Sequence, residues 1–551
     1  MCGILFVINQ ASPNKNHKEL WSRGAKTLAA RGPEGAKWAD FPDGTWCFTR
    51  LAINGLNDAG MQPFTKDGLT WMCNGEIYNA KVLEEEVGLL GATSGSDCEV
   101  LGRLYKHVDR NPVEFARALD GVFALVIRED DMGTATYTVA RDPYGVRPLF
   151  YMKQYDGTMF FASERKALEG FATPDDMILE FPPGEVWTVR VTYDNLYMSK
   201  NKYHEVPWIK QTAVVPLSFL ADALVSAVDK RLMTERPVAA LLSGGLDSSL
   251  IAALVQKRLR EAGRPPLKTF SIGMAGGTDL AYARKVADFI GSDHREVLVT
   301  ADDMFNAIPA VIKAIESYDI TTVRASVGNW LVAKAIKETT DCKVVFNGDG
   351  SDELFGSYLY FFRAPSDLAF EAESRRLMRE IHKYDVLRSD RSISSHGLEA
   401  RTPFLDKQFV AAAMSYSAVA RRPSANRMEK QLIRDAFAEA ALLPQDVLYR
   451  RKEAFSDGVS SQEKSWFEII QEKIVENNCV PTGWQEIAYA KNYWPSPPTA
   501  EAFYYRELFE KDYKHSGKLW EYWMPKWSPE TSDPSARTLS AASAASAAKA
   551  K

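Results

Sequence analysis

Residues 242–249 read Leu242-Ser243-Gly244-Gly245-Leu246-Asp247-Ser248-Ser249, and this stretch decides the fold of the larger part of the chain. It follows an apolar segment, Pro237–Leu242, that predicts a strand, and it leads into a predicted helix. Gly and Ser amides at the start of a helix form a nest for an anion such as phosphate. Asp247 is placed to hold Mg²⁺ beside that anion. A plain strand-to-helix turn is the less favoured interpretation.

The segments around this motif alternate between strand and helix patterns. Further strands are predicted at Leu267–Gly273 and Cys342–Phe346. The predicted helices are Leu217–Thr234, Ser248–Glu261, Gly277–Gly291, Ala301–Glu316 and Ser326–Thr339. This alternation is typical of an α/β domain with a doubly wound parallel sheet. From Ser366 to Tyr522 the pattern is mostly helical, so we expect added helices around the sheet.

A second polar loop follows the predicted strand Cys342–Phe346. It reads Asn347-Gly348-Asp349-Gly350-Ser351-Asp352-Glu353. In a doubly wound sheet both loops lie at the carboxyl ends of strands, where ligands bind, so Asp352 is a candidate partner for Mg²⁺ and pyrophosphate. The alternative is an ordinary helix start capped by Ser351 or Asp352.

Lys452 lies in the basic turn Arg450-Arg451-Lys452-Glu453. A lysine there is able to neutralise a leaving pyrophosphate. Taken alone, such a basic run is more often a solvated helix end.

The first two hundred residues or so show a different pattern of predicted secondary structure. Short strand patterns at Gly3–Asn9, Asp120–Arg128 and Thr136–Ala140 are interrupted by helical stretches near His17–Ala30 and Asp97–Asp109. We expect an α+β domain with stacked or mixed sheets here. The composition changes near Glu205–Pro216, which predicts a linker, and the last residues, 540–551, contain only Ser, Ala and Lys and predict a disordered tail.

Cys2 stands directly behind the initiator Met1. If Met1 is removed, one residue carries both a thiol and a free α-amine, whose pKa near 8 lets it act as the base for its own side chain. The alternative is that the cysteine at this position is an accident of the start.

Three further motifs favour the nucleophile. The Asn74 side-chain amide and the Gly75 backbone N–H are suitable oxyanion donors for acyl transfer, and Arg50 is able to clamp a carboxylate. Asp97 is able to hold an ammonium group. Together they describe a site for an amino acid with a side-chain amide. The alternatives are a turn at Asn74-Gly75 and a helix N-cap at Asp97.

Composition narrows the classes of function. The chain has 551 residues and a net charge of −5, which argues against a general nucleic-acid or membrane-surface function. Six cysteines without a CxxC pair argue against a disulfide scaffold and a cysteine zinc site. No apolar run approaches the length of a membrane span. We expect a cytoplasmic protein in a reducing compartment.

Residues 2–200 resemble the N-terminal-nucleophile glutaminase domain of class II amidotransferases, which implies an αββα sandwich. The matching motifs are Cys2-Gly3-Ile4, Arg31-Gly32-Pro33-Glu34, Arg50-Leu51-Ala52-Ile53, Asn74–Asn79, Gly95–Glu99, Leu119–Ala124, Arg141–Leu149 and Ala162-Ser163-Glu164. The resemblance implies that Cys2 attacks glutamine and releases ammonia, and that Asn74 and Gly75 form the oxyanion hole. The same resemblance implies a set of residues that bind the amino-acid end of glutamine, namely Arg50, Ile53, Glu76 and Asp97.

The heptapeptide Ser243–Ser249 resembles the pyrophosphate loop of enzymes that cleave ATP between its α and β phosphates. With a glutaminase before it, residues 2–537 resemble the glutamine-dependent asparagine synthetase family. Its other matching motifs are Tyr318–Ser326, Glu399–Asp406, Arg451–Gly458, Trp523–Trp527 and Asp533–Arg537. The implied domains are a glutaminase at 2–205, a linker at 206–216, an ATP-dependent synthetase at 217–530 and a tail at 531–551.

The family resemblance implies substrates, cofactors and site residues. ATP activates aspartate to an aspartyl adenylate, and ammonia passed through an internal tunnel displaces AMP to give asparagine. The implied ATP and pyrophosphate residues are Leu242, Ser243, Gly244, Gly245, Asp247, Ser248, Ile272, Asn347, Gly348 and Lys452. The implied Mg²⁺ ligands are Asp247 and Asp352, and the implied aspartate residues are Thr321, Thr322 and Arg324. A homodimer is implied as well, without nucleic-acid or membrane partners.

The chain departs from the family pattern at four positions. Ala30 and Glu34 replace the usual His and Asp around Arg-Gly-Pro, and Asn347 and Asp349 replace the usual Ser and Glu of the second loop. The resemblance implies that the residue at 349 is catalytic, and Asp is one methylene shorter than Glu. A displacement of about 1 Å can cost around a hundredfold in rate, but we expect activity to be retained because the other catalytic positions match.

Two other functions are weighed against asparagine synthesis. One is an amidotransferase of the same architecture that acts on a different carboxylate. The other is a binding protein that keeps the fold but has lost catalysis. Thr321-Thr322-Val323-Arg324 favours aspartate as the acceptor, and the presence of Cys2 and Asp247 argues against a decayed site.

Overall fold

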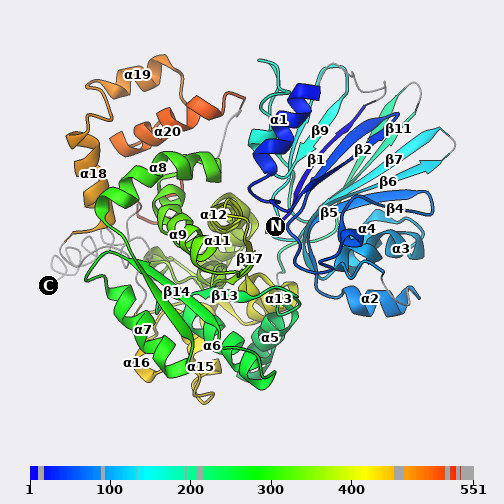
Figure 1. Ribbon diagram of the computed structural model, residues 1–551. Helices are drawn as coiled ribbons and strands as arrows, with labels where there is room; N and C mark the ends of the chain where they lie inside the picture. Colours follow the sequence, from blue (N-terminus) through cyan, green and yellow to red (C-terminus); the bar gives the residue numbers. More distant parts are fainter. Residues whose placement is uncertain are drawn as a thin grey trace.

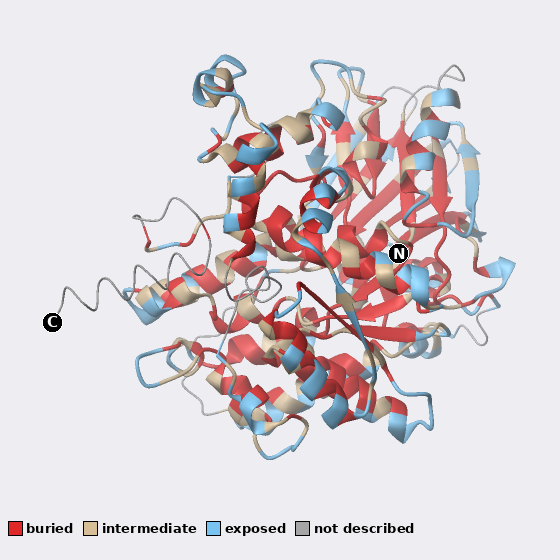
Figure 2. Cartoon of the chain, turned by 60° about the vertical axis from the view of Figure 1, so that its left-hand side comes forward, coloured by how far each residue is buried: buried red, intermediate tan, exposed pale blue. Residues whose placement is uncertain are grey.

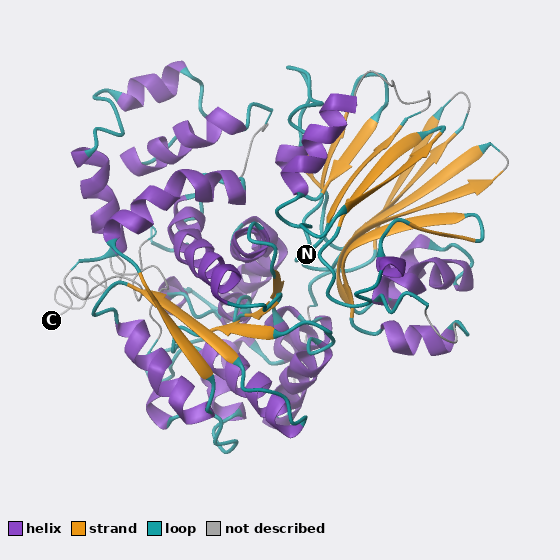
Figure 3. Ribbon diagram, in the orientation of Figure 1, coloured by secondary structure: helices purple, strands orange, loops and turns teal. Residues whose placement is uncertain are grey.

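The computed structural model describes residues 1–9, 18–88, 93–131, 133–192, 195–207, 215–451, 464–515, 521–528 and 534. A strand-rich part and a helix-rich part lie side by side, and the N-terminus lies between them (Figure 1, Figure 3). Among the residues that the structure describes, no helix combines the length and the apolar character needed to cross a bilayer.

The strand-rich part contains two six-stranded antiparallel sheets. The first has the order β10-β8-β9-β1-β3-β2, and the second β12-β11-β7-β6-β5-β4. The strands of the first sheet are β1 (Gly3–Ile8), β2 (Ala36–Phe41), β3 (Gly44–Thr49), β8 (Phe150–Lys153), β9 (Met159–Ala162) and β10 (Leu179–Glu180). Those of the second are β4 (Phe64–Lys66), β5 (Leu69–Ile77), β6 (Gly121–Asp131), β7 (Thr134–Arg141), β11 (Glu185–Val191) and β12 (Leu196–Lys202).

The two sheets pack face to face, with helices outside. Phe6 and Phe161 of the first sheet share one apolar cluster with Tyr137 and Trp187 of the second. Outside the first sheet lies α1 (Lys18–Leu28), and outside the second lie α2 (Ala80–Glu86), α3 (Val100–His107) and α4 (Pro112–Ala118). This layering confirms the predicted αββα sandwich. β1 is buried on both faces, which explains its unbroken apolar sequence.

The helix-rich part is built on one five-stranded sheet of order β15-β14-β13-β16-β17. Every neighbouring pair is parallel, which confirms the predicted α/β architecture. The strands are β13 (Val238–Leu241), β14 (Lys268–Gly273), β15 (Asp293–Leu298), β16 (Val344–Phe346) and β17 (Glu399–Arg401). β15 and β17 were not predicted, because β15 begins with four polar or charged residues, two of the three residues of β17 are charged, and neither segment carries a strand pattern.

Helices cover both faces of this sheet, and α18, α19 and α20 pack on other helices farther out. The helices of this part are α5 (Leu217–Lys230), α6 (Leu246–Glu261), α7 (Thr278–Ile290), α8 (Ala301–Ile315), α9 (Ile320–Thr339), α10 (Ser351–Phe355), α11 (Asp367–Glu380), α12 (Asp385–Ser394), α13 (Lys407–Ser415), α14 (Ala418–Arg421), α15 (Gln431–Ala436), α16 (Gln445–Leu448), α18 (Trp466–Glu476), α19 (Trp484–Ala490) and α20 (Ala500–Asp512). Ala240 of β13 faces the cluster of α5 and α6, and its neighbour Ala239 faces the cluster of α9 and α12, as the strand period of two requires.

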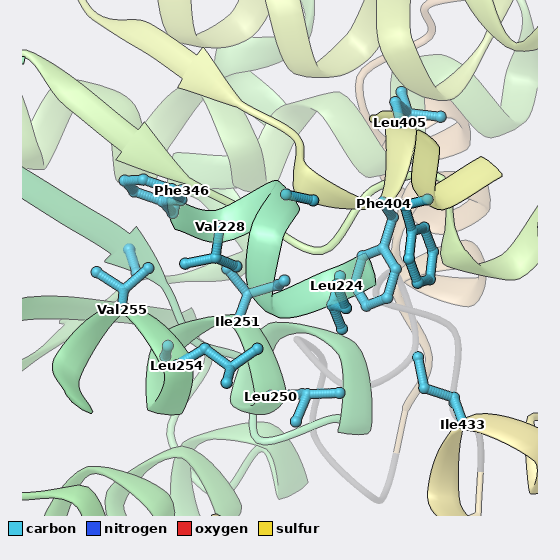
Figure 4. Packing of buried hydrophobic residues seen from close by; sticks show 14 of the residues in the cluster. Leu224, Val228, Leu250, Ile251, Leu254, Val255, Phe346, Phe404, Leu405 and Ile433 are labelled. Carbon is cyan, nitrogen blue, oxygen red and sulfur yellow. The ribbon is translucent and has the colours of Figure 1, made fainter. Parts of the chain in front are cut away.

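The core beside α6 shows how the sheet is buried. Leu250, Ile251 and Val255 of this helix pack with Leu224 of α5 and with Phe404 (Figure 4). Buried residues fill the strands and the central helices, while exposed residues gather on the rim and on the outer helices (Figure 2).

The predicted helix boundaries are correct to within a few residues except at two helices. α9 begins at Ile320 instead of Ser326, because the Asp319 side chain caps it by accepting a hydrogen bond from the Thr322 backbone N–H at 2.9 Å. α5 ends at Lys230 instead of Thr234.

A buried network of charged side chains joins the two parts. Arg31, just after α1, donates to Asp390 of α12 at 2.7 Å and to Glu164 at 2.9 Å. Arg147 of the strand-rich part lies 3.6 Å from Glu399 of β17, and its side chain is fully buried like that of Arg31. Because these charged side chains are paired with one another away from water, the relative position of the two parts is tightly constrained.

Candidate active sites

Cys2 lies just before β1, near the contact between the two parts. Its Sγ accepts a hydrogen bond from the Leu51 backbone N–H at 3.5 Å and donates to the Leu51 carbonyl at 3.6 Å. Its own carbonyl accepts from Arg31 Nε at 3.0 Å. The half-buried thiol is therefore anchored between β1 and the segment that follows β3.

Asn74 and Gly75 lie within β5, in the opposite sheet. Asn74 is fully buried, and its Nδ2 donates to Ser163 Oγ at 3.5 Å, the same oxygen that accepts from the Ile4 backbone N–H. Gly75 has no room for a side chain, since a Cβ there would lie 2.1 Å from the Val122 carbonyl oxygen. β5 runs straight through both residues, so the alternative of a turn at this position is wrong.

The proposed glutamine-binding side chains all point into buried surroundings. Arg50 donates to the Asn57 carbonyl at 2.8 Å and to the Gly55 carbonyl. Glu76 accepts from Asn54 Nδ2 at 2.9 Å and lies 3.2 Å from Arg401 Nη2.

Asp97 does not cap the short helix that it begins. Ser96 does so, and Asp97 instead accepts a hydrogen bond from the Ile77 backbone N–H at 2.7 Å. Burial raises the pKa of Asp97 to about 6. The N-cap interpretation of Asp97 is therefore wrong. Ile53, three residues after Arg50 in the sequence, is buried as well.

Met1 is buried at the same contact. Its amine lies 3.9 Å from Glu399 Oε2, and burial lowers the pKa of this amine to about 6. Burial also raises the pKa of the Cys2 thiol to about 11. With Met1 in place, the nitrogen of Cys2 is part of a peptide bond. Cys2 then has no free amine to accept the thiol proton, so the thiol is not activated.

The second site is a pocket of about 300 Å³ at the carboxyl ends of β13, β14 and β16. It brings together most of the residues predicted for ATP, Mg²⁺ and aspartate. They are Leu242, Ser243, Gly245, Asp247, Ser248, Ile272, Thr321, Thr322, Arg324, Asn347, Gly348, Asp349 and Asp352. Gly244 is not among the lining residues. It has φ +71 and packs against α7, where a Cβ would lie 2.5 Å from the Ala283 nitrogen.

The loop before α6 presents the start of a helix to this pocket. Gly245 is the N-cap and has no side chain to satisfy the first amides of the helix. Ser248 Oγ accepts from the Ser243 backbone N–H at 3.2 Å, which closes the loop on itself. Unsatisfied amides at a helix start are suited to binding phosphate oxygens.

Lys430 is a buried lysine that lines the pocket. Its Nζ lies between Asp247 Oδ2 and Asp352 Oδ1, at 2.5 Å from the latter. Burial lowers the pKa of Lys430, but the two carboxylates outweigh burial and hold the pKa above its usual value. The alternative in which Ser351 or Asp352 caps α10 is wrong, because Gly350 occupies the N-cap position and no side chain caps the helix.

The same two carboxylates suit Mg²⁺. They converge on one cation, and Mg²⁺ is usually held by one or two carboxylates together with substrate phosphate oxygens and water. In the described part of the chain, no three His, Cys, Asp or Glu side chains form a protein-only metal site. The donor set therefore fits a Mg²⁺ ion that arrives with a phosphate ligand.

Asp349 lines the pocket. One of its carboxylate oxygens accepts a hydrogen bond, and the other is open in the sense that it has no hydrogen-bond partner in the part of the chain that the structure describes. Its Oδ1 accepts from Arg388 Nη2 at 3.1 Å, and Arg388 also pairs with Asp385 at 2.6 Å. Oδ2 is buried and makes no hydrogen bond to any described residue. Burial raises the pKa of Asp349, opposed chiefly by Arg388.

The predicted aspartate residues reach the pocket but are engaged with other protein groups. The hydroxyls of Thr321 and Thr322 donate to the Asp319 carboxylate at 2.6 and 2.8 Å. Arg324 forms a two-pronged ion pair with the buried Glu501 of α20, at 2.8 and 2.6 Å. Lys452 lies outside the described residues.

Both halves of the chain match known families. Residues 1–180 match the glutamine amidotransferase domain, and residues 220–373 and 364–533 match asparagine synthase. The chain is 41% identical to the glutamine-hydrolysing asparagine synthetases of Cricetulus griseus, Gallus gallus and Homo sapiens, over 98% of this chain and 98% of each relative.

The chain belongs to the asparagine synthase family.

Three side chains in or beside this family member's pocket were not found from the sequence. Lys430 is a single lysine in the turn just before α15, and Glu501 lies far from Arg324 along the chain. Arg388 had no motif around it that indicated phosphate or carboxylate binding. Each acts through a contact between distant segments, which no local pattern reports.

The raised pKa of Cys2 gives a direct prediction for a chain that keeps Met1. Roughly one thiol in a thousand should be ionised at pH 8 when the pKa is about 11. Alkylation of Cys2 by iodoacetamide, followed by mass spectrometry of the N-terminal peptide, should be slow at pH 8 and should still be rising with pH at pH 10. The unfolded chain is the control, because its thiols have an ordinary pKa of about 8.5. A rate that already levels off below pH 9 in the folded chain would contradict the prediction.

Proposed function

We infer that this protein is a glutamine-dependent asparagine synthetase. The observation that carries this conclusion is the pairing, in one chain, of Cys2 beside an αββα sandwich with a pocket formed by two loops at the carboxyl ends of parallel strands. Close relatives with the same activity match 98% of the chain, so an amidotransferase for another acceptor is not favoured.

The glutaminase reaction is proposed to use Cys2 after Met1 has been removed. The freed α-amine takes the thiol proton, and the sulfur attacks the side-chain amide carbon of glutamine. Asn74 Nδ2 and the Gly75 N–H stabilise the oxyanion, ammonia leaves, and water releases glutamate from the thioester. Arg50 and Asp97 are proposed to hold the carboxylate and the ammonium group of glutamine, with Ile53 and Glu76 beside them.

The synthetase reaction is proposed to occur in the second pocket. A side-chain carboxylate oxygen of aspartate attacks the α-phosphorus of ATP, and pyrophosphate leaves. The amides at the start of α6 and the Lys430 ammonium, which both face this pocket, are proposed to stabilise the leaving group. Mg²⁺ held by Asp247 and Asp352 would add further positive charge, and Lys452 is proposed to contact phosphate.

The second half of this reaction needs a base near the adenylate. Asp349 lines the pocket, and its buried Oδ2 makes no hydrogen bond to any described residue, which supports a role in accepting a proton as ammonia attacks the acyl carbon and AMP leaves. Thr321, Thr322 and Arg324 are proposed to bind aspartate and the intermediate, although this requires them to share their present hydrogen bonds. Leu242, Ile272 and Gly348 are proposed to surround the adenine nucleotide.

Each of the two proposed reactions is assigned to one part of the chain. We propose a glutaminase domain at 2–205, a linker at 206–216, a synthetase domain at 217–530 and a tail at 531–551, with ammonia passing between the domains. Six free cysteines support a reducing, cytoplasmic setting. The homodimer rests on the family resemblance alone.

A product assay tests the function. The enzyme is incubated with ATP, Mg²⁺, glutamine and aspartate, and asparagine, AMP, pyrophosphate and glutamate are followed together. We expect one AMP and one pyrophosphate for each asparagine. Glutamate without asparagine, or amidation of another carboxylate in place of aspartate, would overturn the assignment.

Cys2→Ala should abolish the use of glutamine and leave ammonia-dependent synthesis intact. The substitution removes the nucleophile but touches nothing in the second pocket. Asparagine formation from ammonium chloride is the readout and also serves as the control for folding. Equal loss of both activities would refute the two-site arrangement.

Asp349→Glu should raise asparagine synthesis by no more than about tenfold, which corresponds to about 1.4 kcal/mol of barrier. Arg388 already holds Asp349 with its second oxygen open, so the shorter side chain is placed to act. The exposed Asp446→Glu is the matched control, and ammonia-dependent kcat is the measurement. A larger gain would show that the chain is impaired as it stands.

Lys430→Met should lower aspartate-dependent ATP–pyrophosphate exchange by about 100-fold, the effect of removing one group that stabilises developing charge. Methionine keeps the length of the side chain without its charge. Glutamine hydrolysis should survive. The control is Lys285→Met, which removes an exposed lysine paired with Asp446 in the same domain. Exchange that stays within twofold of this control would exclude Lys430 from the reaction.

A further inference from the structure

Asp349 is shorter by one methylene than the Glu that the family resemblance implies at this position, so a reacting role for its carboxylate depends on the contacts that place it. Two ends of the loop that carries it are fixed. Beyond Asp349, Gly350 has φ +98, and a Cβ there would lie 2.5 Å from Leu405 Cδ2. Before Asp349, the Asn347 backbone N–H donates to the Arg401 carbonyl at 3.1 Å, as a continuation of the parallel sheet.

Asn347 holds the backbone of Asp349 from within the loop. Its Oδ1 accepts a hydrogen bond from the Asp349 backbone N–H at 3.3 Å, the contact of a short Asx-type turn. This bond forms only if the Asn347 amide group keeps its oxygen turned toward Asp349. The orientation of the amide therefore decides where the backbone of Asp349 lies.

Ser389 of α12 sets that orientation. Asn347 Nδ2 donates to Ser389 Oγ at 2.5 Å, and the exposed fractions of the two residues are 3% and 1%. Because water does not reach the pair, neither group has an easy substitute for the other, and a buried polar group that loses its partner is costly. The amide is thus locked with its nitrogen on Ser389 and its oxygen on Asp349.

The same helix also holds the side chain of Asp349. Arg388, adjacent to Ser389 in α12, donates to Asp349 Oδ1 at 3.1 Å. The Ser389 hydroxyl lies near enough to the carboxylate to favour its ionised form. Two consecutive residues of one helix therefore fix the carboxylate: Arg388 through the side chain, and Ser389 through its hydroxyl near the carboxylate and through the loop.

We propose that Asn347 and Ser389 are positioning residues for Asp349: their buried hydrogen bond sets the loop so that the shorter carboxylate presents its open oxygen to the reacting carbon. The proposal rests on the catalytic role of Asp349 given under the proposed function. The Asn347 amide contacts both Ser389 and Asp349. In this proposal Asn347 positions Asp349, which is a different role from contacting the nucleotide.

The test uses Ser389→Ala, Asn347→Ser and the double variant in the full-length enzyme with Mg²⁺. Each single change should lower kcat of ammonia-dependent asparagine synthesis by about tenfold, while KM for ATP and aspartate stays within about twofold. The double variant should be no slower than the slower single variant, because both changes break the same contact. Glutamine hydrolysis at Cys2 should be unaffected and reports on folding.

Ser392→Ala is the matched control. It makes the same substitution in the same helix, at a fully buried serine whose hydroxyl has no hydrogen-bond partner among the described residues. It should leave kcat within about twofold of the starting enzyme.

Three results would overturn the proposal. They are a Ser389→Ala enzyme that behaves like Ser392→Ala, losses that multiply in the double variant, and a rise in KM for ATP in place of the fall in kcat. If Ser389→Ala loses glutamine hydrolysis as well, and so fails to fold, Asn347→Ser decides the matter by the same criteria. If the unmodified enzyme makes no asparagine from ammonia, the proposed function itself fails. That outcome is distinct from an active enzyme that is indifferent to these changes.

Discussion

The buried pairing of Arg31 with Asp390 is the interaction on which the rest of the structure depends. Arg31 donates at once to Asp390 in the synthetase and, through Nε, to the carbonyl of Cys2. Both charges are withdrawn from water, and breaking a buried pair of this kind by removing one partner typically costs about 3–5 kcal/mol. The cysteine proposed as the nucleophile of one site is therefore held in place by the domain that contains the other.

Helix α12 explains how one element can serve both sites. Successive residues of a helix point about 100° apart, so Ser389 and Asp390 face different neighbours. Ser389 bonds Asn347 at the synthetase pocket, and Asp390 bonds Arg31 at the domain contact. Arg391 continues the pattern by pairing with Glu316, which also accepts the backbone N–H groups of Arg165 and Lys166 from the glutaminase side.

The sequence predicted what depends on local pattern, and it missed what depends on contact. The α+β character of the first part, the parallel sheet of the second and the loop at Ser243 follow from strand periodicity and from a motif between a strand and a helix, whereas the αββα layering was implied by the family resemblance. Lys430 and Glu501 carry no such pattern, because each becomes important only when distant segments meet. β17 was missed for the same reason: its three residues are a strand only because β16 lies beside them.

The second loop shows most clearly why substitution against a family pattern is hard to judge from sequence. Asp349 alone suggests a weakened enzyme, because a carboxylate one methylene too short would stand back from the reaction. Asn347 alone suggests an altered nucleotide contact. Together with Ser389 they form one buried arrangement, in which the change at 347 supplies the hydrogen bond that fixes the loop carrying the change at 349. The two departures are then a single structural solution, and their effects on rate cannot be added as if they were independent.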